Sequence, residues 1–254
     1  MKISISIFMI PFILILLSNK LFNLYMWIIV ILIIHELGHI LAAKIFKFKI
    51  TKIKLHPYGL SANIKDLGYM NIYKELLIAI AGILMQLLFI PLLYLFNNLN
   101  IISYSYLNYL LDINYNIIMF NMLMIYPLDG GRCLQCILGL IFKYKISEIL
   151  LIGLSIINII LVYNLKVLND IAGAIVLIVL LISNILRIKE LNYKLINFYM
   201  YRYINPFKGK IKINHTKDLY RNSLNLLVIR GELIREDKFL NDFFNKNNKK
   251  SSNI

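Results

Sequence analysis

Two histidines and a glutamate lie together in the stretch His35-Glu36-Leu37-Gly38-His39. On a helix, residues four apart project from nearly the same face, so His35 and His39 can bind one metal ion together. Zinc suits imidazole, and a catalytic zinc takes three protein ligands and a water whose pKa it lowers towards about 7. Glu36, beside the first histidine, is placed to accept a proton from that water. The pattern is typical of metal-dependent peptidases.

The position of this stretch in the chain strengthens the interpretation. It continues from the apolar run Trp27–Leu32 without a break, and it holds two of the four histidines. An ionised side chain deep in a bilayer costs about 2.5–3.5 kcal/mol on insertion scales, so titratable groups at membrane depth usually serve a function. This favours a metal site over a chance pattern.

A third ligand is needed, and Asp129 is the candidate. It lies in an apolar stretch beside Pro127, which disrupts a helix, and next to Gly130 and Gly131, which permit unusual backbone angles. Non-helical backbone at membrane depth occurs where it is buried in protein or lines a watery cavity. We therefore expect Asp129 to face a site. The alternative is an interfacial turn with a solvated aspartate.

The composition indicates a polytopic membrane protein. The chain has 254 residues, of which 59% are hydrophobic and only 16% charged, and several apolar stretches approach the roughly 20 residues that cross a bilayer. We expect an all-α protein with about six transmembrane helices. The expected spans are Ile3–Leu17, Leu21–Ala43, Leu76–Phe96, Leu111–Tyr126 continuing through Cys133–Phe142, Ile149–Tyr163 and Val167–Leu186.

The positive charge follows this topology. If the N-terminus is cytoplasmic, only Lys20 and Lys166 of the 28 Lys and Arg residues fall in outer loops. Both ends are therefore predicted to be cytoplasmic, and the net charge of +15 reflects topology, not a nucleic-acid partner. Cys133 and Cys136 cannot make a disulfide framework and are predicted to be core residues. With this topology, Asp129 and the two histidines reach the same depth near the cytoplasmic face.

Two further segments have patterns of their own. Residues 51–64 alternate in part and contain Pro57 and Gly59, which predicts a hairpin; the alternative is a basic surface loop. Residues 1–190 form the predicted membrane domain. Residues 191–254 form a predicted basic cytoplasmic tail with apolar islands, and its end, residues 245–254, is predicted to be disordered.

The two motifs His35-Glu36-Leu37-Gly38-His39 and Pro127-Leu128-Asp129-Gly130-Gly131 together resemble the site-2 protease family of intramembrane metalloproteases. The resemblance covers about residues 1–190 and is strongest to the sporulation branch, which releases a membrane-tethered pro-sigma factor. It implies that Glu36 is the general base, that His35, His39 and Asp129 hold one Zn²⁺ per chain, and that Asn121 positions the substrate or stabilises the oxyanion. It also implies that the hairpin dips into the membrane and pairs with an unwound substrate as an added strand.

The sequence departs from the family pattern at three places. Met124 stands where the family commonly has proline, and the third-span motif of Ala-Gly-Pro followed by Asn appears as Ala81-Gly82-Ile83-Leu84-Met85-Gln86. Neither change removes a proposed ligand. The tail is short for the CBS domain of the sporulation branch, so we expect at most a reduced CBS-like segment.

The sequence thus predicts a zinc-dependent intramembrane endopeptidase that cuts a membrane-tethered bacterial protein near the cytoplasmic face. The expected location is the cell membrane, and in a spore former the membrane around the forespore, with a membrane inhibitor or regulator as a further partner. Two alternatives remain open. One is a metal or proton transporter that uses the same His and Asp residues as a transport site, and the other is an inactive scaffold that binds clients without cutting them.

Overall fold

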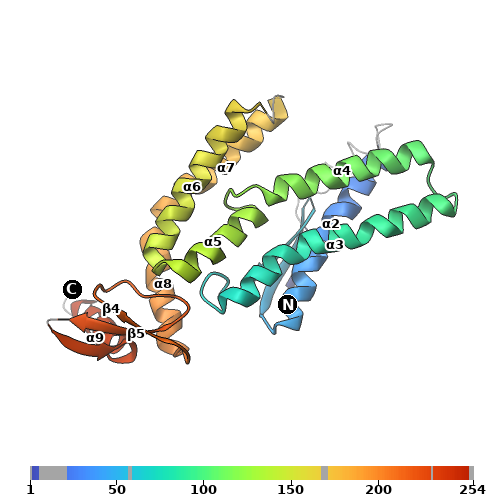
Figure 1. Ribbon diagram of the computed structural model, residues 1–254. Helices are drawn as coiled ribbons and strands as arrows, with labels where there is room; N and C mark the ends of the chain where they lie inside the picture. Colours follow the sequence, from blue (N-terminus) through green and yellow to red (C-terminus); the bar gives the residue numbers. More distant parts are fainter. Residues whose placement is uncertain (1, 6–21, 57–58, 167–170, 230, 252–254) are drawn as a thin grey trace. The chain divides into compact units, whose positions relative to one another are not determined.

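The computed structural model describes residues 2–5, 22–56, 59–166, 171–229 and 231–251 (Figure 1). Helices dominate, and two small three-stranded sheets accompany them. In chain order the elements are β1 (Lys2–Ile5), α2 (Phe22–Ile45), β2 (Ile50–His56), β3 (Gly59–Ile64), α3 (Ile72–Asn98), α4 (Tyr104–Met122), α5 (Asp129–Ile141), α6 (Tyr144–Asn164), α7 (Ile171–Lys189), α8 (Leu191–Ile204), β4 (Ile211–Asn214), β5 (Leu224–Ile229), β6 (Glu232–Arg235) and α9 (Glu236–Ser251).

The chain divides into two compact units, which we describe separately. The first comprises residues Met1–Leu67, Lys74–Leu123 and Leu128–Gly130, and the second comprises Gly68–Tyr73, Met124–Pro127 and Gly131–Ile254. The first unit therefore contains all of α2 and α4, most of α3 and the start of α5. The second contains the rest of α5 and everything that follows it.

The core of the first unit forms where α2, α3 and α4 pack together. The buried side chains of its hydrophobic cluster come from all three helices and the turn before α4: Ile31, Phe89, Leu93, Ile102, Leu107 and Leu110. Ser103 caps α4, because its hydroxyl accepts a hydrogen bond from the Tyr106 backbone N–H at 3.3 Å. This packing fixes the three helices that carry the polar residues discussed below.

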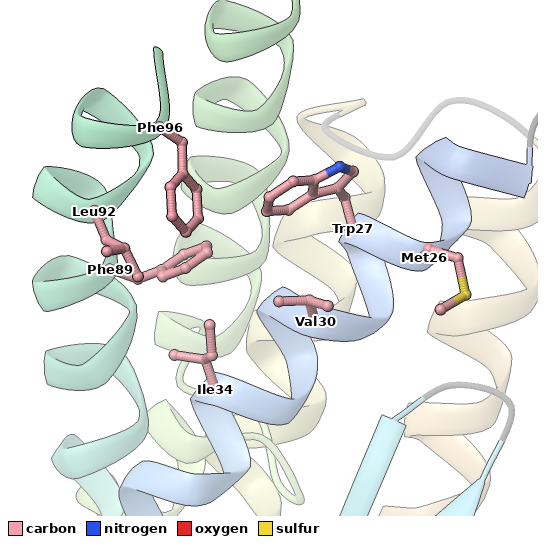
Figure 2. Close-up of a pocket in the computed structure, with 7 residues that line it drawn as sticks. All are labelled: Met26, Trp27, Val30, Ile34, Phe89, Leu92 and Phe96. Carbon is pink, nitrogen blue, oxygen red and sulfur yellow. The ribbon is translucent and has the colours of Figure 1, made fainter. Parts of the chain in front are cut away.

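Gly38 allows α2 and α3 to approach closely. A Cβ atom at this position would collide with the backbone carbonyl of Ala81 and lie 2.7 Å from Cγ of Met85. Further along the same two helices, an apolar hollow of about 360 Å³ opens between them, with Trp27, Phe89 and Phe96 turned toward one another (Figure 2). All its lining side chains are hydrophobic, so none of them could act as a metal ligand or a general base.

The predicted hairpin is present in the first unit. Strands β2 and β3 pair in antiparallel register, with Ile53 opposite Ala62 and Leu55 opposite Leu60. β1 adds to β2 in parallel, with Ile3 opposite Ile53. Ile3–Ile5 were predicted to begin the first transmembrane helix, and here the prediction is wrong, because these residues form a strand. The remainder of that predicted span, residues 6–17, lies outside the described residues.

The helical chain is interrupted before Asp129, where the sequence predicts a break. Residues 123–128 separate α4 from α5. In the second unit, the backbone N–H of Tyr126 donates to the Ser155 hydroxyl at 3.0 Å, and the Asn184 amide donates to the Tyr126 carbonyl at 2.8 Å. The guanidinium of Arg187 lies over the Tyr126 ring at 3.7 Å. Side chains of α6 and α7 thus hold this non-helical backbone.

An ion pair links α6 and α7 in the second unit. The carboxylate of Glu148 accepts hydrogen bonds from Arg187 at 2.6 and 3.1 Å, and both side chains are buried. Gln135 of α5 donates to the other oxygen of Glu148 at 2.6 Å. A buried charge costs free energy unless it is paired and hydrogen-bonded, and Glu148 meets both conditions.

The segment after α7 folds around a second sheet. β4 pairs with β5 in parallel, and β6 pairs with β5 in antiparallel register. Leu227 of β5 packs into a core with Phe198 of α8 and Leu240 of α9. Arg202 binds both carboxylate oxygens of Glu236, at 2.6 and 2.8 Å. Helix α9 includes part of the end that was predicted to be disordered, and the CBS likeness of the tail stays a prediction.

The all-α class predicted from the sequence needs a correction, since the structure contains two small sheets. Within the described residues, three helices are long and apolar enough to cross a membrane: Tyr25–Ile45, Ile72–Asn98 and Tyr144–Asn164, with mean hydropathies of 2.0, 2.6 and 2.3. The chain is therefore mostly helical with several candidate spans. The count of six spans stays a prediction.

Candidate metal centre

His35, His39 and Asp129 converge at one point in the first unit. The Nε2 atoms of the two histidines lie 3.1 Å apart, and Oδ2 of Asp129 lies 2.9 Å from Nε2 of His35 and 3.1 Å from Nε2 of His39. All three residues are buried, with 6–8% of their surface exposed. The structure thus brings together the three residues that the sequence suggested as metal ligands.

The local fold explains why these three side chains meet. The two histidines are one helical turn apart on α2, so both imidazoles project from one face. Asp129 is the first residue of α5 and follows the break at residues 123–128. Because the chain is not helical just before it, Asp129 can present its carboxylate at an angle that a continuous helix through α4 would not give.

The hydrogen bonds behind the imidazoles leave acceptors at the centre. Nδ1 of His39 lies 2.7 Å from the backbone carbonyl of Ile78, which can only accept, so Nδ1 carries the hydrogen. Nδ1 of His35 lies 2.8 Å from Oε1 of Gln86. In a neutral imidazole with a hydrogen on Nδ1, Nε2 has only a lone pair. Two such lone pairs and a carboxylate oxygen therefore face one another, and a cation or a proton must lie between them.

The spacing suits a small metal ion. Nitrogen and oxygen ligands at 2.0–2.1 Å from a tetrahedral zinc lie about 3.3 Å from each other. The three interatomic distances here are 2.9–3.1 Å, so a small outward adjustment would complete the site. Two imidazoles with one carboxylate also form a donor set that catalytic zinc sites use. The residues present therefore fit zinc.

Gly82 of α3 borders the centre on the side of the Nε2 atoms. A Cβ atom there would lie 2.5 Å from Nε2 of His39 and 2.7 Å from Cε1 of His35. No real Cβ contact is that short, so a methyl group would have to displace the imidazoles. Glycine leaves open the space that a bound ion and its ligands require.

Gly82→Ala is accordingly expected to lower zinc affinity by at least about tenfold, since loss of a group that only supports a ligand already costs 10- to 100-fold, and here the ligands themselves would move. Zinc per purified chain, measured against a competing chelator, checks this. The matched control is Gly153→Ala on α6, where an added Cβ would meet nothing within 4 Å. Equal zinc affinity in both variants would show that Gly82 does not border the ion.

The two residues predicted to act on the substrate lie close to the ligands in the chain. Glu36 follows His35 on α2, is half-buried, and is not one of the three clustered residues. Asn121 lies near the end of α4 and is also half-buried, and its amide donates to the Ile117 carbonyl of the same helix at 3.0 Å. The roles of both residues stay predictions.

Gln86 and Asn114 were not predicted as functional residues. Gln86 appeared only as a departure from the family's third-span motif, and Asn114 was not singled out. The available signal was general: a polar side chain inside an apolar helix is costly and usually has a role. Cys133 and Cys136, by contrast, do not belong to the metal-ligand cluster found among the described residues.

No protein-family model matches the chain. A stretch of 151 residues, 58% of this chain, is 36% identical to a zinc metalloprotease of Methanocaldococcus jannaschii and covers 44% of that protein. A stretch of 107 residues, 42% of this chain, is 29% identical to stage IV sporulation protein FB of Bacillus subtilis and covers 37% of it. The chain therefore spans less than half the length of each of these two relatives.

A solved structure is also similar to the chain. The site-2 protease from Methanocaldococcus jannaschii superimposes with a TM-score of 0.54 and 25% sequence identity. The match covers 74% of this chain and 91% of that one. The likeness therefore extends over most of the chain and not only over the short motifs.

Proposed function

Because the chain belongs to the site-2 protease family, we propose that it is a zinc-dependent endopeptidase that hydrolyses a peptide bond of a membrane-tethered protein. The similar proteins match only part of their length, and the proposal assigns their protease activity to this whole protein. The proposed zinc ligands are His35, His39 and Asp129.

One observation carries the proposal. Two imidazole nitrogens and a carboxylate oxygen face one another at 2.9–3.1 Å, and the Nδ1 atom of each ring has an oxygen partner on the far side from the centre. A structural cluster of buried polar groups pairs donors with acceptors. This cluster instead presents three acceptors to one point, and only a bound cation or a shared proton satisfies them. The donor set of two imidazoles and a carboxylate supports zinc as that cation.

The bound zinc, Glu36 and Asn121 would each have a separate role in peptide hydrolysis. When bound, zinc supplies Lewis-acid chemistry, polarising a carbonyl and lowering the pKa of a water to about 7. Glu36 accepts a proton from the attacking water and passes it to the nitrogen of the leaving amine. Asn121, by the family resemblance, orients the substrate or donates to the developing oxyanion.

The family resemblance also supports a proposal for the substrate and its location. We propose a bacterial regulator tethered to the membrane, such as a pro-sigma factor, cut near the cytoplasmic face. The distribution of Lys and Arg residues supports six spans with both termini in the cytoplasm. Similarity to a sporulation protein supports, for a chain from a spore former, the membrane around the forespore as the location.

The transporter alternative is not favoured. The similar proteins of known type are proteases, and a transporter would distribute polar groups along several helices to form a pathway. An inactive scaffold could retain the same metal ligands and would differ from a protease only in that it does not cleave its client. An assay for cleavage therefore separates both the transporter and the scaffold from the proposed peptidase.

The test is coexpression of the chain with candidate tethered proteins. A soluble fragment should appear with the active chain, and the purified protein should lose cleavage when a chelator removes zinc and regain it when zinc is restored. A chain that binds zinc but releases no fragment from any tethered protein would contradict the peptidase assignment. Zinc flux into sealed vesicles without cleavage would favour the transporter.

A further inference from the structure

Two uncharged amide side chains are buried behind the first histidine. Gln86 of α3 is 0% exposed and Asn114 of α4 is 1% exposed. Oε1 of Gln86 lies 2.8 Å from Nδ1 of His35, and Nε2 of Gln86 lies 3.1 Å from Oδ1 of Asn114. Nδ2 of Asn114 returns to the backbone carbonyl of Gln86 at 3.4 Å. The three side chains form one continuous hydrogen-bonded row.

The direction of every bond in this row is set at its far end. A backbone carbonyl can only accept a hydrogen bond, so Asn114 must present its NH₂ group there. Its Oδ1 atom then faces Gln86, which must present its own NH₂ group to it. That leaves Oε1 of Gln86 facing His35, and an oxygen acceptor requires a hydrogen on Nδ1. Reversing either amide would place two donors or two acceptors face to face.

His39 is held in the same tautomer by a single hydrogen bond. Nδ1 of His39 bonds directly to the Ile78 carbonyl, which also can only accept. Both imidazoles are therefore held with the hydrogen on Nδ1 and the lone pair of Nε2 directed at Asp129. His39 uses one backbone group for this purpose, whereas His35 uses two side chains from two other helices.

We propose that Gln86 and Asn114 are positioning residues that fix the tautomer and ring orientation of His35 for metal binding. This inference rests on the metal site of the proposed function. Amides buried among apolar helices cost free energy unless they are hydrogen-bonded, and apolar side chains would fill the same space without that cost. Partners that hold the second nitrogen of a ligating imidazole commonly account for 10- to 100-fold in metal affinity.

Two substitutions of similar size separate positioning from packing. Gln86→Met fills the space but offers no acceptor to Nδ1, and zinc affinity should fall about 10- to 100-fold. Gln86→Glu keeps an oxygen opposite Nδ1, and its buried carboxyl in the neutral form can still donate through its O–H to Oδ1 of Asn114. This variant should therefore retain most of the affinity. Zinc dissociation constants by competition with a chelator, and thermal unfolding of the zinc-free proteins, are the measurements. The matched control is Asn97→Leu on the same helix, which removes an amide bonded to the Ile102 carbonyl at 2.9 Å, outside the row.

A Met variant that binds zinc as tightly as the wild type would overturn the proposal. So would equal losses in the Met and Glu variants, because a packing role would not distinguish them. If the Met variant does not fold, Asn114→Leu decides, since it leaves Gln86 in place but frees its amide to reverse: weaker zinc binding supports the row, and unchanged binding refutes it. A wild type that does not bind zinc overturns both proposals, whereas zinc binding without cleavage removes only the peptidase assignment.

Discussion

Glu36→Gln is expected to abolish release of the soluble fragment while the purified protein keeps its zinc. The amide cannot accept a proton from the attacking water, whereas His35, His39 and Asp129 are unchanged. Loss of a general base typically costs about 10²–10⁴-fold in rate. Fragment release in coexpressing cells and zinc per chain in detergent are the two measurements.

The control for this substitution is a carboxylate far from the cluster along the chain. The carboxylate of Glu190 is exposed and lies 3.7 Å from Nζ of Lys194 in the second unit, and a long ion pair with an exposed partner contributes little to stability. Glu190→Gln should cleave and bind zinc as the wild type does. Near-normal cleavage by Glu36→Gln would remove the proton-transfer role and with it the proposed mechanism.

Asp129→Asn is expected to lower both zinc occupancy and cleavage sharply. The amide is a far weaker ligand than a carboxylate, and its NH₂ group would face the two histidine nitrogens if it turned inward. Asp129→Glu keeps the charge and should retain part of both properties. Metal content by mass spectrometry of purified variants and cleavage of a tethered substrate are the measurements.

This substitution also tests the alternative role, in which Asp129 only shapes a turn. Asparagine meets the requirements of a turn as well as aspartate does, so a turn former would tolerate the change. Full zinc and full activity in the Asn variant would mean that the third ligand is another residue. Asp112→Asn on the exposed side of α4 is the control and should behave as the wild type.

The sequence predicted the site where the spacing of residues and the free-energy cost of placing polar groups in an apolar stretch indicated the same arrangement. His35 and His39 share a helix face because they are four residues apart, and the Pro-Gly-Gly surroundings of Asp129 indicated the break that lets it reach them. The hairpin followed from alternation and turn residues. In each case a local pattern favoured one arrangement over its alternative, and the structure has that arrangement.

Two features were not predicted from the sequence, the strand at residues 3–5 and the contact of Gln86 with Asn114, because the local pattern is ambiguous in the first case and missing in the second. Residues 3–5 begin a long apolar run, and a short apolar segment reads equally well as strand or helix until its pairing partner is known. Gln86 and Asn114 contact each other across two different helices, and no spacing in the sequence predicts that contact. The row of hydrogen bonds behind His35 is therefore visible only in three dimensions.

The break before Asp129 also bears on how dry this region can be. Backbone N–H and C=O groups outside a helix normally need water, and at membrane depth that need would draw water to them. At Tyr126 the hydroxyl of Ser155 and the amide of Asn184 take the place of those water molecules. The peptide groups of Tyr126 are thus solvated by the protein itself. The interruption can therefore persist without a hydration shell at that residue.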